Sequence, residues 1–233
     1  MTSLSQNARV AGLLYILASA VGILRLLYIP SVLIVDGDAA ATANNVATHE
    51  WLFRWGIVST LVGAALWLFV PLALYRLLKS VDQELAVLMV ILGSLMQVPL
   101  YFCNAVNDVA ALLFARGSDF LSVFDKPQRD ALARLFLYLH HQLDLANMMF
   151  AGLWLIPFGL LVYKSGFLPR FIGVWLIIGC FAYLAFSLTG FLLPGHEGKV
   201  FTYGQPFMFG EVAIMLWLVI LGAKEPRLAA ATS

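Results

Sequence analysis

The chain has 233 residues, of which 62% are hydrophobic and only 12% are charged, and its formal net charge is +1. Soluble domains are about half apolar and about a quarter charged. This composition, with a mean hydropathy of +0.90, excludes an ordinary soluble domain and indicates an integral membrane protein surrounded by a lipid bilayer. No stretch is dense in Lys and Arg, which excludes nucleic acid as an expected partner.

The sequence contains six apolar runs long enough to cross a bilayer as helices, because a hydrocarbon core of about 30 Å needs roughly 20 residues. We therefore predict an all-α polytopic membrane protein, a bundle of six transmembrane helices forming one domain over residues 1–233. Prolines at 71, 99 and 157 should kink these helices without ending them. The runs are Val10 to Tyr28, Trp55 to Leu78, Leu85 to Phe114, Leu143 to Tyr163, Phe167 to Leu193 and Phe207 to Gly222.

The first run needs separate consideration, because Arg9 and the triplet Ala18-Ser19-Ala20 resemble the features of a cleavable signal peptide. We expect it to remain as the first spanning helix. The two cysteines, Cys103 and Cys180, lie inside apolar runs and form no CxxC motif. They are therefore expected to be small core residues.

Loop charge predicts the orientation. Runs two and three, and runs four and five, are joined by short basic connections, whereas the other connections are longer and more acidic. By the positive-inside rule this places both termini in the cytoplasm. The basic residues assigned to that face are Arg9, Arg76, Lys79, Lys164, Arg170, Lys224 and Arg227.

Two of the longer, extracytoplasmic loops should contain short helices of their own. Asp38 is a good N-cap for the Ala-rich segment that follows it. Asp125 is placed to cap a second helix, with Pro127 in its first turn. This second helix either continues into the fourth spanning helix or lies along the membrane interface.

Three segments carry a resemblance to a known family: GDAAATANNVATHEWLFRWG, LYRLLKSVDQELAVL and GLLVYKSGFLPRFIGVWL. They are similar to the corresponding stretches of the bacterial membrane family catalogued as domain of unknown function 4386. The resemblance implies a six-helix protein of the bacterial inner membrane. It supplies no catalytic residues, so function has to be argued from the polar groups.

Polar side chains recur on one face of the third and fourth runs. A charged residue near the middle of a spanning helix costs about 2.5 to 3.5 kcal/mol, so these groups should face each other and not lipid. Steps of three and four residues place each set on a single helical stripe. The two sets are Gln97, Tyr101, Asn104 and Asp108 in run three, and His140, Asp144 and Asn147 in run four.

Arg25 and Glu211 add charges from the first and last runs. Following each run across the membrane places Arg25, Asp108, Asp144 and Glu211 in the same, extracytoplasmic half of the bilayer. We therefore predict one polar pocket that opens to the outer leaflet. In it, either Asp108 or Glu211 pairs with Arg25, and the other of these two acids remains as a functional carboxylate.

The first functional hypothesis is that this pocket binds a small or lipid-like ligand, with acid–base or metal-assisted hydrolytic chemistry. His140 would be the base, Asp144 would orient it, and Asp108 and Glu211 would be ligands or proton carriers. Alternatively, His140, Asp144 and Glu211 would hold a divalent metal. The expected ligand-binding residues are Arg25, Gln97, Tyr101, Asn104 and Asn147.

Two other hypotheses use the same residues. The carboxylates would bind protons or cations in a transporter or ion pathway. Otherwise the polar groups only hold the helices together in a non-catalytic scaffold subunit, whose side chains cap and pair without chemistry. Whether the protein is an enzyme, and whether it forms a homo-oligomer, are left open by the sequence.

Overall fold

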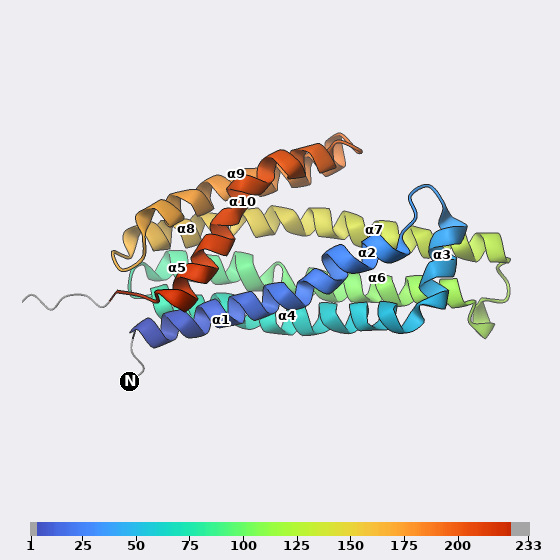
Figure 1. Ribbon diagram of the computed structural model, residues 1–233, viewed down its shortest axis with the longest axis horizontal. Coiled ribbons are helices and arrows are strands. Elements are labelled where there is room, and N and C mark those ends of the chain that lie inside the picture. Colours follow the sequence, from blue (N-terminus) through green and yellow to red (C-terminus); the bar gives the residue numbers. More distant parts are fainter. Residues whose placement is uncertain (1–3, 225–233) are drawn as a thin grey trace, which may run out of the picture.

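The computed structural model describes residues 4–224, and within them the secondary structure is helical throughout (Figure 1). In chain order the elements are α1 (Leu4–Ile23), the π-helical turn η1 (Leu24–Tyr28), α2 (Ile29–Leu33), α3 (Ala39–Thr48), α4 (Glu50–Leu78), α5 (Gln83–Val90), the π-helical turn η2 (Ile91–Leu95), α6 (Val98–Arg116), the 3-10 turn η3 (Asp119–Leu121), α7 (Lys126–Leu153), α8 (Leu155–Lys164), α9 (Arg170–Leu192) and α10 (Glu197–Ile220).

Six of these helical segments are long and apolar enough to cross a membrane, which confirms the predicted six-helix bundle. The third span joins α5, η2 and α6, and the fourth joins α7 and α8. In Figure 1 the start of α1 and the end of α10 lie together at the left. We call this the short-loop end, because it also carries residues 79–82 and 165–169, and we call the opposite end the α3 end. Arg227, predicted for the short-loop end, lies outside the described residues.

The buried apolar side chains form two clusters along the bundle. The larger cluster occupies the short-loop end and the middle, and it contains Tyr15, Trp154 and Phe158. The smaller cluster lies toward the α3 end and contains Phe53 and Leu137. Buried polar side chains, including Arg25, Asp108 and His140, lie among the residues of the smaller cluster, so hydrophobic packing alone does not account for this part of the bundle.

Both predicted loop helices form, and both caps are confirmed. The Asp38 side chain accepts a hydrogen bond from the Ala41 amide at 2.8 Å. Asp125 and Gln128 form a reciprocal capping box at the start of α7. This helix runs without interruption into the fourth span, so of the two arrangements considered, the continuous one is found.

The last span is longer than predicted, because α10 begins at Glu197 and not at Phe207. Pro206 therefore lies inside the helix, where its missing amide would weaken a soluble helix. The Pro206 carbonyl accepts a hydrogen bond from the Trp175 indole at 3.0 Å, which ties this part of α10 to α9. Apolarity marks only the later part of the helix, which is why the run predicted from the sequence was too short.

The three prolines behave differently from one another. Pro71 lies inside an unbroken α4, as predicted. Pro99 follows the π-helical turn η2, and Pro157 follows the break at Trp154 between α7 and α8. In η2 the freed Gly93 carbonyl accepts from the Trp67 indole at 2.8 Å, so a neighbouring helix satisfies the backbone at the interruption.

Glycines allow the closest helix contacts. A Cβ at Gly159 would lie 2.6 Å from the Gly173 carbonyl oxygen, and one at Gly152 would lie 2.9 Å from the Cys180 carbonyl oxygen. Side chains at these positions would force α9 away from α7 and α8. Gly152 and Gly159 thus allow close packing of the helices, whereas a Cβ at Gly63 would have only one neighbour, at 3.9 Å.

One ion pair joins two connections at the short-loop end and makes a pH-dependent prediction. Asp82 caps α5 and lies 2.9 Å from Lys164 Nζ, and this hydrogen bond holds the pKa of the Asp82 carboxyl below its usual range. Ionised Asp82 therefore stabilises the fold above pH about 4, and the effect disappears as the pH falls through the lowered folded-state pKa. Asp82→Asn should lower the thermal unfolding midpoint at pH 7, with the difference vanishing in acid.

Glu84→Gln is the matched control, because it removes a carboxylate from the same turn but leaves the pair with Lys164 intact. Its midpoint should follow that of the wild type more closely at every pH. An Asp82→Asn difference that stays constant down to pH about 3 would contradict the linkage.

Candidate functional site

A buried ion pair joins the first and third spans. Arg25 in η1 donates from Nε to Asp108 Oδ2 at 2.8 Å and from a terminal nitrogen to Asp108 Oδ1 at 2.7 Å. The Asp108 side chain has no exposed surface, and that of Arg25 is 9% exposed. Two parallel hydrogen bonds between charged groups form the strongest arrangement that a guanidinium can make with a carboxylate. This pair anchors the polar region.

His140 from α7 lies between two carboxylates. Its Nδ1 is 3.0 Å from Asp108 Oδ1, and its Nε2 is 3.2 Å from Asp144 Oδ2. The Nδ1 contact falls outside hydrogen-bond geometry, so it is primarily electrostatic. The predicted proximity of His140 and Asp144 is confirmed, and Asp108 is an additional partner on the other side of the ring. An imidazole between two acids is suited to bind and release a proton.

Asn104 completes this group on the third span. Its amide nitrogen donates to Asp144 Oδ1 at 2.6 Å, which fixes the carboxylate whose other oxygen faces His140. The Asp144 side chain is 26% exposed, so it is the most accessible acid of the group. We call Arg25, Asn104, Asp108, His140 and Asp144 the charged network.

Local backbone structure explains how Arg25 reaches Asp108. Arg25 lies in a π-helical turn, a feature that is frequent at functional sites and widens the helix by one residue. Gly56 of α4 packs against the same part of the first span, since a Cβ there would lie 3.1 Å from Ile29 Cδ1 and 3.4 Å from Arg25 Cδ. The Phe53 ring lies 5.9 Å from the guanidinium carbon, within cation–π distance.

Glu211 does not join the charged network. Its carboxylate accepts hydrogen bonds from the hydroxyls of Tyr15 and Tyr183, the latter at 2.6 Å. All three side chains are largely removed from solvent. We call Glu211, Tyr15 and Tyr183 the glutamate–tyrosine cluster. Sequence reasoning missed both tyrosines, although a tyrosine in the middle of a spanning run, away from the interface, marks a buried hydroxyl that needs a partner.

The prediction that all the charges share one level of the bilayer is therefore wrong for Glu211. Its partner Tyr15 precedes Arg25 by ten residues along the first span, which corresponds to about 15 Å of helix. Glu211 lies near the middle of its long helix, whose true start is Glu197. Because the predicted run began only at Phe207, Glu211 was placed too close to the membrane surface.

The structure does not bring His140, Asp144 and Glu211 together as a metal site. Within residues 4–224, no three His, Cys, Asp or Glu side chains form a group able to hold a metal ion. Asp108 and Asp144 face opposite nitrogens of His140, so their oxygens cannot converge on one ion beside the ring. Glu211 is already engaged by two tyrosines. These residues therefore do not form the metal site that the sequence suggested.

Tyr101 and Asn147 lie between the two polar groups. Tyr101 lies beside the Asn147 side chain, and its hydroxyl interacts electrostatically with the carboxylates of Asp144 and Glu211. The side-chain oxygens of Asn104, Asn147 and Gln97 are buried without a hydrogen-bond partner. Buried unpaired acceptors are uncommon, and each invites a donor such as water. Of the five predicted ligand-binding residues, Arg25 and Asn104 belong to the charged network and Tyr101 and Asn147 lie near it, whereas Gln97 donates to the Leu92 carbonyl at 3.2 Å.

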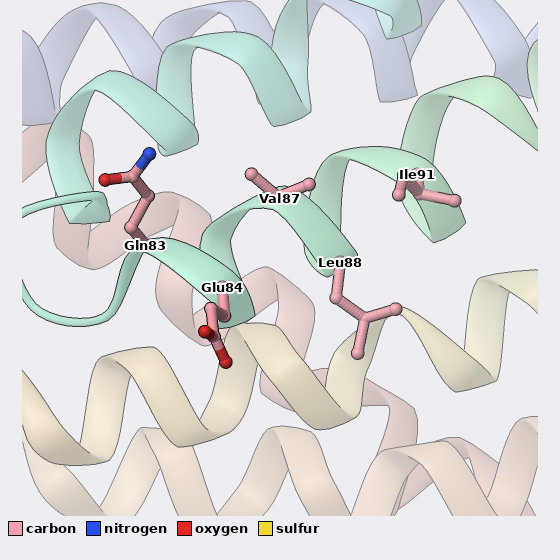
Figure 2. A pocket seen from close by; sticks show the side chains of 5 residues that line it. All are labelled: Gln83, Glu84, Val87, Leu88 and Ile91. Atoms are coloured by element: carbon pink, nitrogen blue, oxygen red, sulfur yellow. The ribbon is translucent and has the colours of Figure 1, made fainter.

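The predicted pocket is not shown at the charged network. One hollow lies along α5 and the start of η2, as Figure 2 shows, and another lies on the surface between α9 and α10. Ile91, the lining residue of the first hollow nearest to Asp108, precedes it by 17 residues or about 25 Å of helix. The lining residues of the first hollow are Gln83, Glu84, Val87, Leu88 and Ile91.

Comparison with known proteins confirms the family suggested by the sequence. The pattern of the family described as "Domain of unknown function (DUF4386)" matches residues 10–222. The chain belongs to this family. The matched region contains the whole charged network and the glutamate–tyrosine cluster, so both lie within the part shared with the family.

A protein of Archaeoglobus fulgidus named "Uncharacterized protein" is 38% identical over 82 residues. The match covers 35% of this chain and 47% of the relative, so it spans about half the length of that protein. No solved structure matches the chain.

The ion pair between Arg25 and Asp108 makes a stability prediction. Arg25→Met and Asp108→Asn should each lower the free energy of unfolding by about 3 to 5 kcal/mol, because each leaves a buried charge without its partner. The double variant should lose less than the sum of the two single losses. Denaturant titration in mixed micelles measures all three values.

Arg54→Met is the matched control. Arg54 pairs with Glu50 at 2.7 Å on the surface, where its side chain is 45% exposed, so the loss should stay below about 1 kcal/mol. Equal losses for Arg25→Met and Arg54→Met, or strictly additive losses in the double variant, would show that the buried pair does not anchor the region.

Proposed function

We propose that the chain is a proton-coupled multi-pass membrane protein, in which His140 takes up and releases the proton. The observation that carries the proposal is the position of His140, with a carboxylate 3.0 Å from one ring nitrogen and another 3.2 Å from the other. A buried acid or imidazole within a membrane bundle is costly, and such groups commonly mark proton or ion pathways.

The charge balance of the network supports this role. One arginine and two ionised aspartates leave a net charge of −1 when His140 is neutral, and zero when it is protonated. A buried network that changes by one charge responds strongly to proton binding, because its neighbours cannot be screened by water. A change in the charge of His140 should therefore affect how the first, third and fourth spans pack together.

Asp144 gives the network its route to solvent. It is more exposed than Asp108, and it contacts the second nitrogen of His140. A proton can therefore pass between solvent and the buried ring through Asp144, while Asp108 and Arg25 hold the inner side of the ring. If both termini are cytoplasmic, as the basic loops predict, this exchange occurs with the extracytoplasmic side.

The alternative of acid–base chemistry on a small or lipid-like ligand uses the same histidine. It is favoured by the exposure of Asp144 and by the unpaired amide oxygen of Asn104 beside it. It requires a cavity for the ligand beside His140, whereas proton coupling requires only the contacts of the ring with Asp108 and Asp144.

Nitrogen NMR of histidine-labelled protein in nanodiscs tests the proposal. The His140 signals should change with pH, and Asp108→Asn and Asp144→Asn should each move that profile by about one to three pH units, since each removes a charge in contact with the ring. His140→Gln assigns the signals.

His141 is the internal control, because it is the next residue along α7 but is exposed. Its signals should be nearly unaffected by Asp108→Asn. If His140 keeps one protonation state throughout pH about 5 to 9, or if both aspartate variants leave its profile unchanged, the proposed function fails.

A further inference from the structure

The glutamate–tyrosine cluster is a second titratable group that the charged network does not include. Glu211 comes from α10, Tyr15 from α1 and Tyr183 from α9, so it draws on three spans, of which only the first also contributes to the network. Within residues 4–224 no cationic side chain forms an ion pair with Glu211, and two neutral hydroxyls hold the carboxylate instead. A carboxylate held by neutral donors in a membrane can be neutralised by binding a proton.

Polar side chains on α6 and α7 lie between the network and this cluster. Asp144 and Asn104 are joined at 2.6 Å, and Tyr101 lies within reach of the charges of both Asp144 and Glu211. Tyr101 also contacts Asn147, one turn beyond Asp144 on the same face of α7. Tyr101 is itself close to Tyr15 and Tyr183. The polar groups therefore descend from the α3 end toward the middle of the bundle.

Unpaired acceptors along this route point to bound water. The amide oxygens of Asn104 and Asn147 are buried and have no donor among residues 4–224; Asn104 lies one turn from Tyr101 on α6, and Asn147 lies on α7. A buried acceptor without a partner costs about 1 to 3 kcal/mol, and a water molecule between polar groups removes that cost. Water between these amides, Tyr101 and the two acids would complete a chain of hydrogen bonds.

We infer that Glu211 is an inner proton acceptor, connected to His140 and Asp144 by Tyr101, Asn147 and buried water. This deepens the proposed function and rests on it. His140 gives its proton to Asp144, the proton moves along the water chain, and the Glu211 carboxylate accepts it and becomes neutral. Solvent at Asp144 then returns a proton to His140, so one proton is transferred and no electrons move.

The route ends at Glu211. On the side of the short-loop end, Tyr15 packs edge-on against Trp67 and Trp154, and Trp154 stacks on Phe158 at a centroid distance of 5.2 Å. These rings belong to the larger apolar cluster or pack against it, where a proton has no hydrogen-bonded path. The protein would therefore take up a proton from the α3 end and hold it in the middle of the bundle.

Infrared spectroscopy of the full chain in phosphatidylcholine–phosphatidylglycerol nanodiscs tests this inference. A drop in pH should produce a protonated carboxyl band that is lost in Glu211→Gln. Its rise should be slowed about tenfold in Tyr101→Phe and Asn147→Leu, the effect of a barrier raised by about 1.4 kcal/mol. Tyr138→Phe is the control, because Tyr138 is 51% exposed on α7, and it should leave the rate unchanged.

If Glu211→Gln does not fold, Tyr183→Phe gives the same information. It keeps the carboxyl but removes one hydrogen bond, and it should shift the frequency of the band. The inference is overturned if no such band appears, if it rises equally fast in Tyr101→Phe and Asn147→Leu, or if the Glu211 carboxylate responds to Na⁺ at constant pH instead of to protons.

The same samples separate this inference from the proposed function. If the His140 signals change with pH as expected but no carboxyl band of Glu211 appears, Glu211 is not the inner acceptor, and the proposed function of the charged network is unaffected. If the His140 signals do not change with pH, the proposed function is wrong, and so is the route through Asp144, even if Glu211 takes up a proton by another path.

Discussion

The cost of removing Arg25 and Asp108 from water is the constraint on which the rest of the polar region depends. Neither group can face lipid, and each alone would be prohibitively expensive in a membrane bundle. Their two hydrogen bonds, at 2.7 and 2.8 Å, tie the first span to the third and set the level at which α7 must present His140. The π-helical turn at Arg25 is the local change in backbone that accompanies this contact.

Once Arg25 and Asp108 are paired, the remaining groups acquire distinct roles. Asp108 is shared between a permanent cation and an imidazole, whereas Asp144 is shared between the imidazole and an amide. The first carboxylate is sealed and the second is partly open to solvent. In the proposed function this difference in exposure gives the network a direction, because Asp144 is the carboxylate that contacts solvent.

The glutamate–tyrosine cluster shows a second way to keep an acid inside a membrane bundle. In the part of the chain that the structure describes, no cation pairs with Glu211, and two hydroxyl groups from different spans satisfy both of its oxygens. Hydroxyl donors allow the acid to be charged or neutral with little rearrangement, since a hydroxyl can donate or accept. An arginine can only donate hydrogen bonds, so Asp108, which pairs with Arg25, and Glu211, which is held by hydroxyls, differ in what they can do despite similar burial.

The sequence by itself determined the six spans, the two helix caps, the family and the shared face of His140 and Asp144. These features depend on composition, on local capping and on spacing within one helix, all of which act over a few residues. It also predicted correctly that Arg25 would take one acid as its partner. The tertiary structure was needed to show that this acid is Asp108, that Glu211 is held by Tyr15 and Tyr183, and that Asp108 and Asp144 face opposite sides of His140. Depth and partner choice depend on how separate helices are tilted and where each one begins, and the apolar pattern of α10 concealed its first turns.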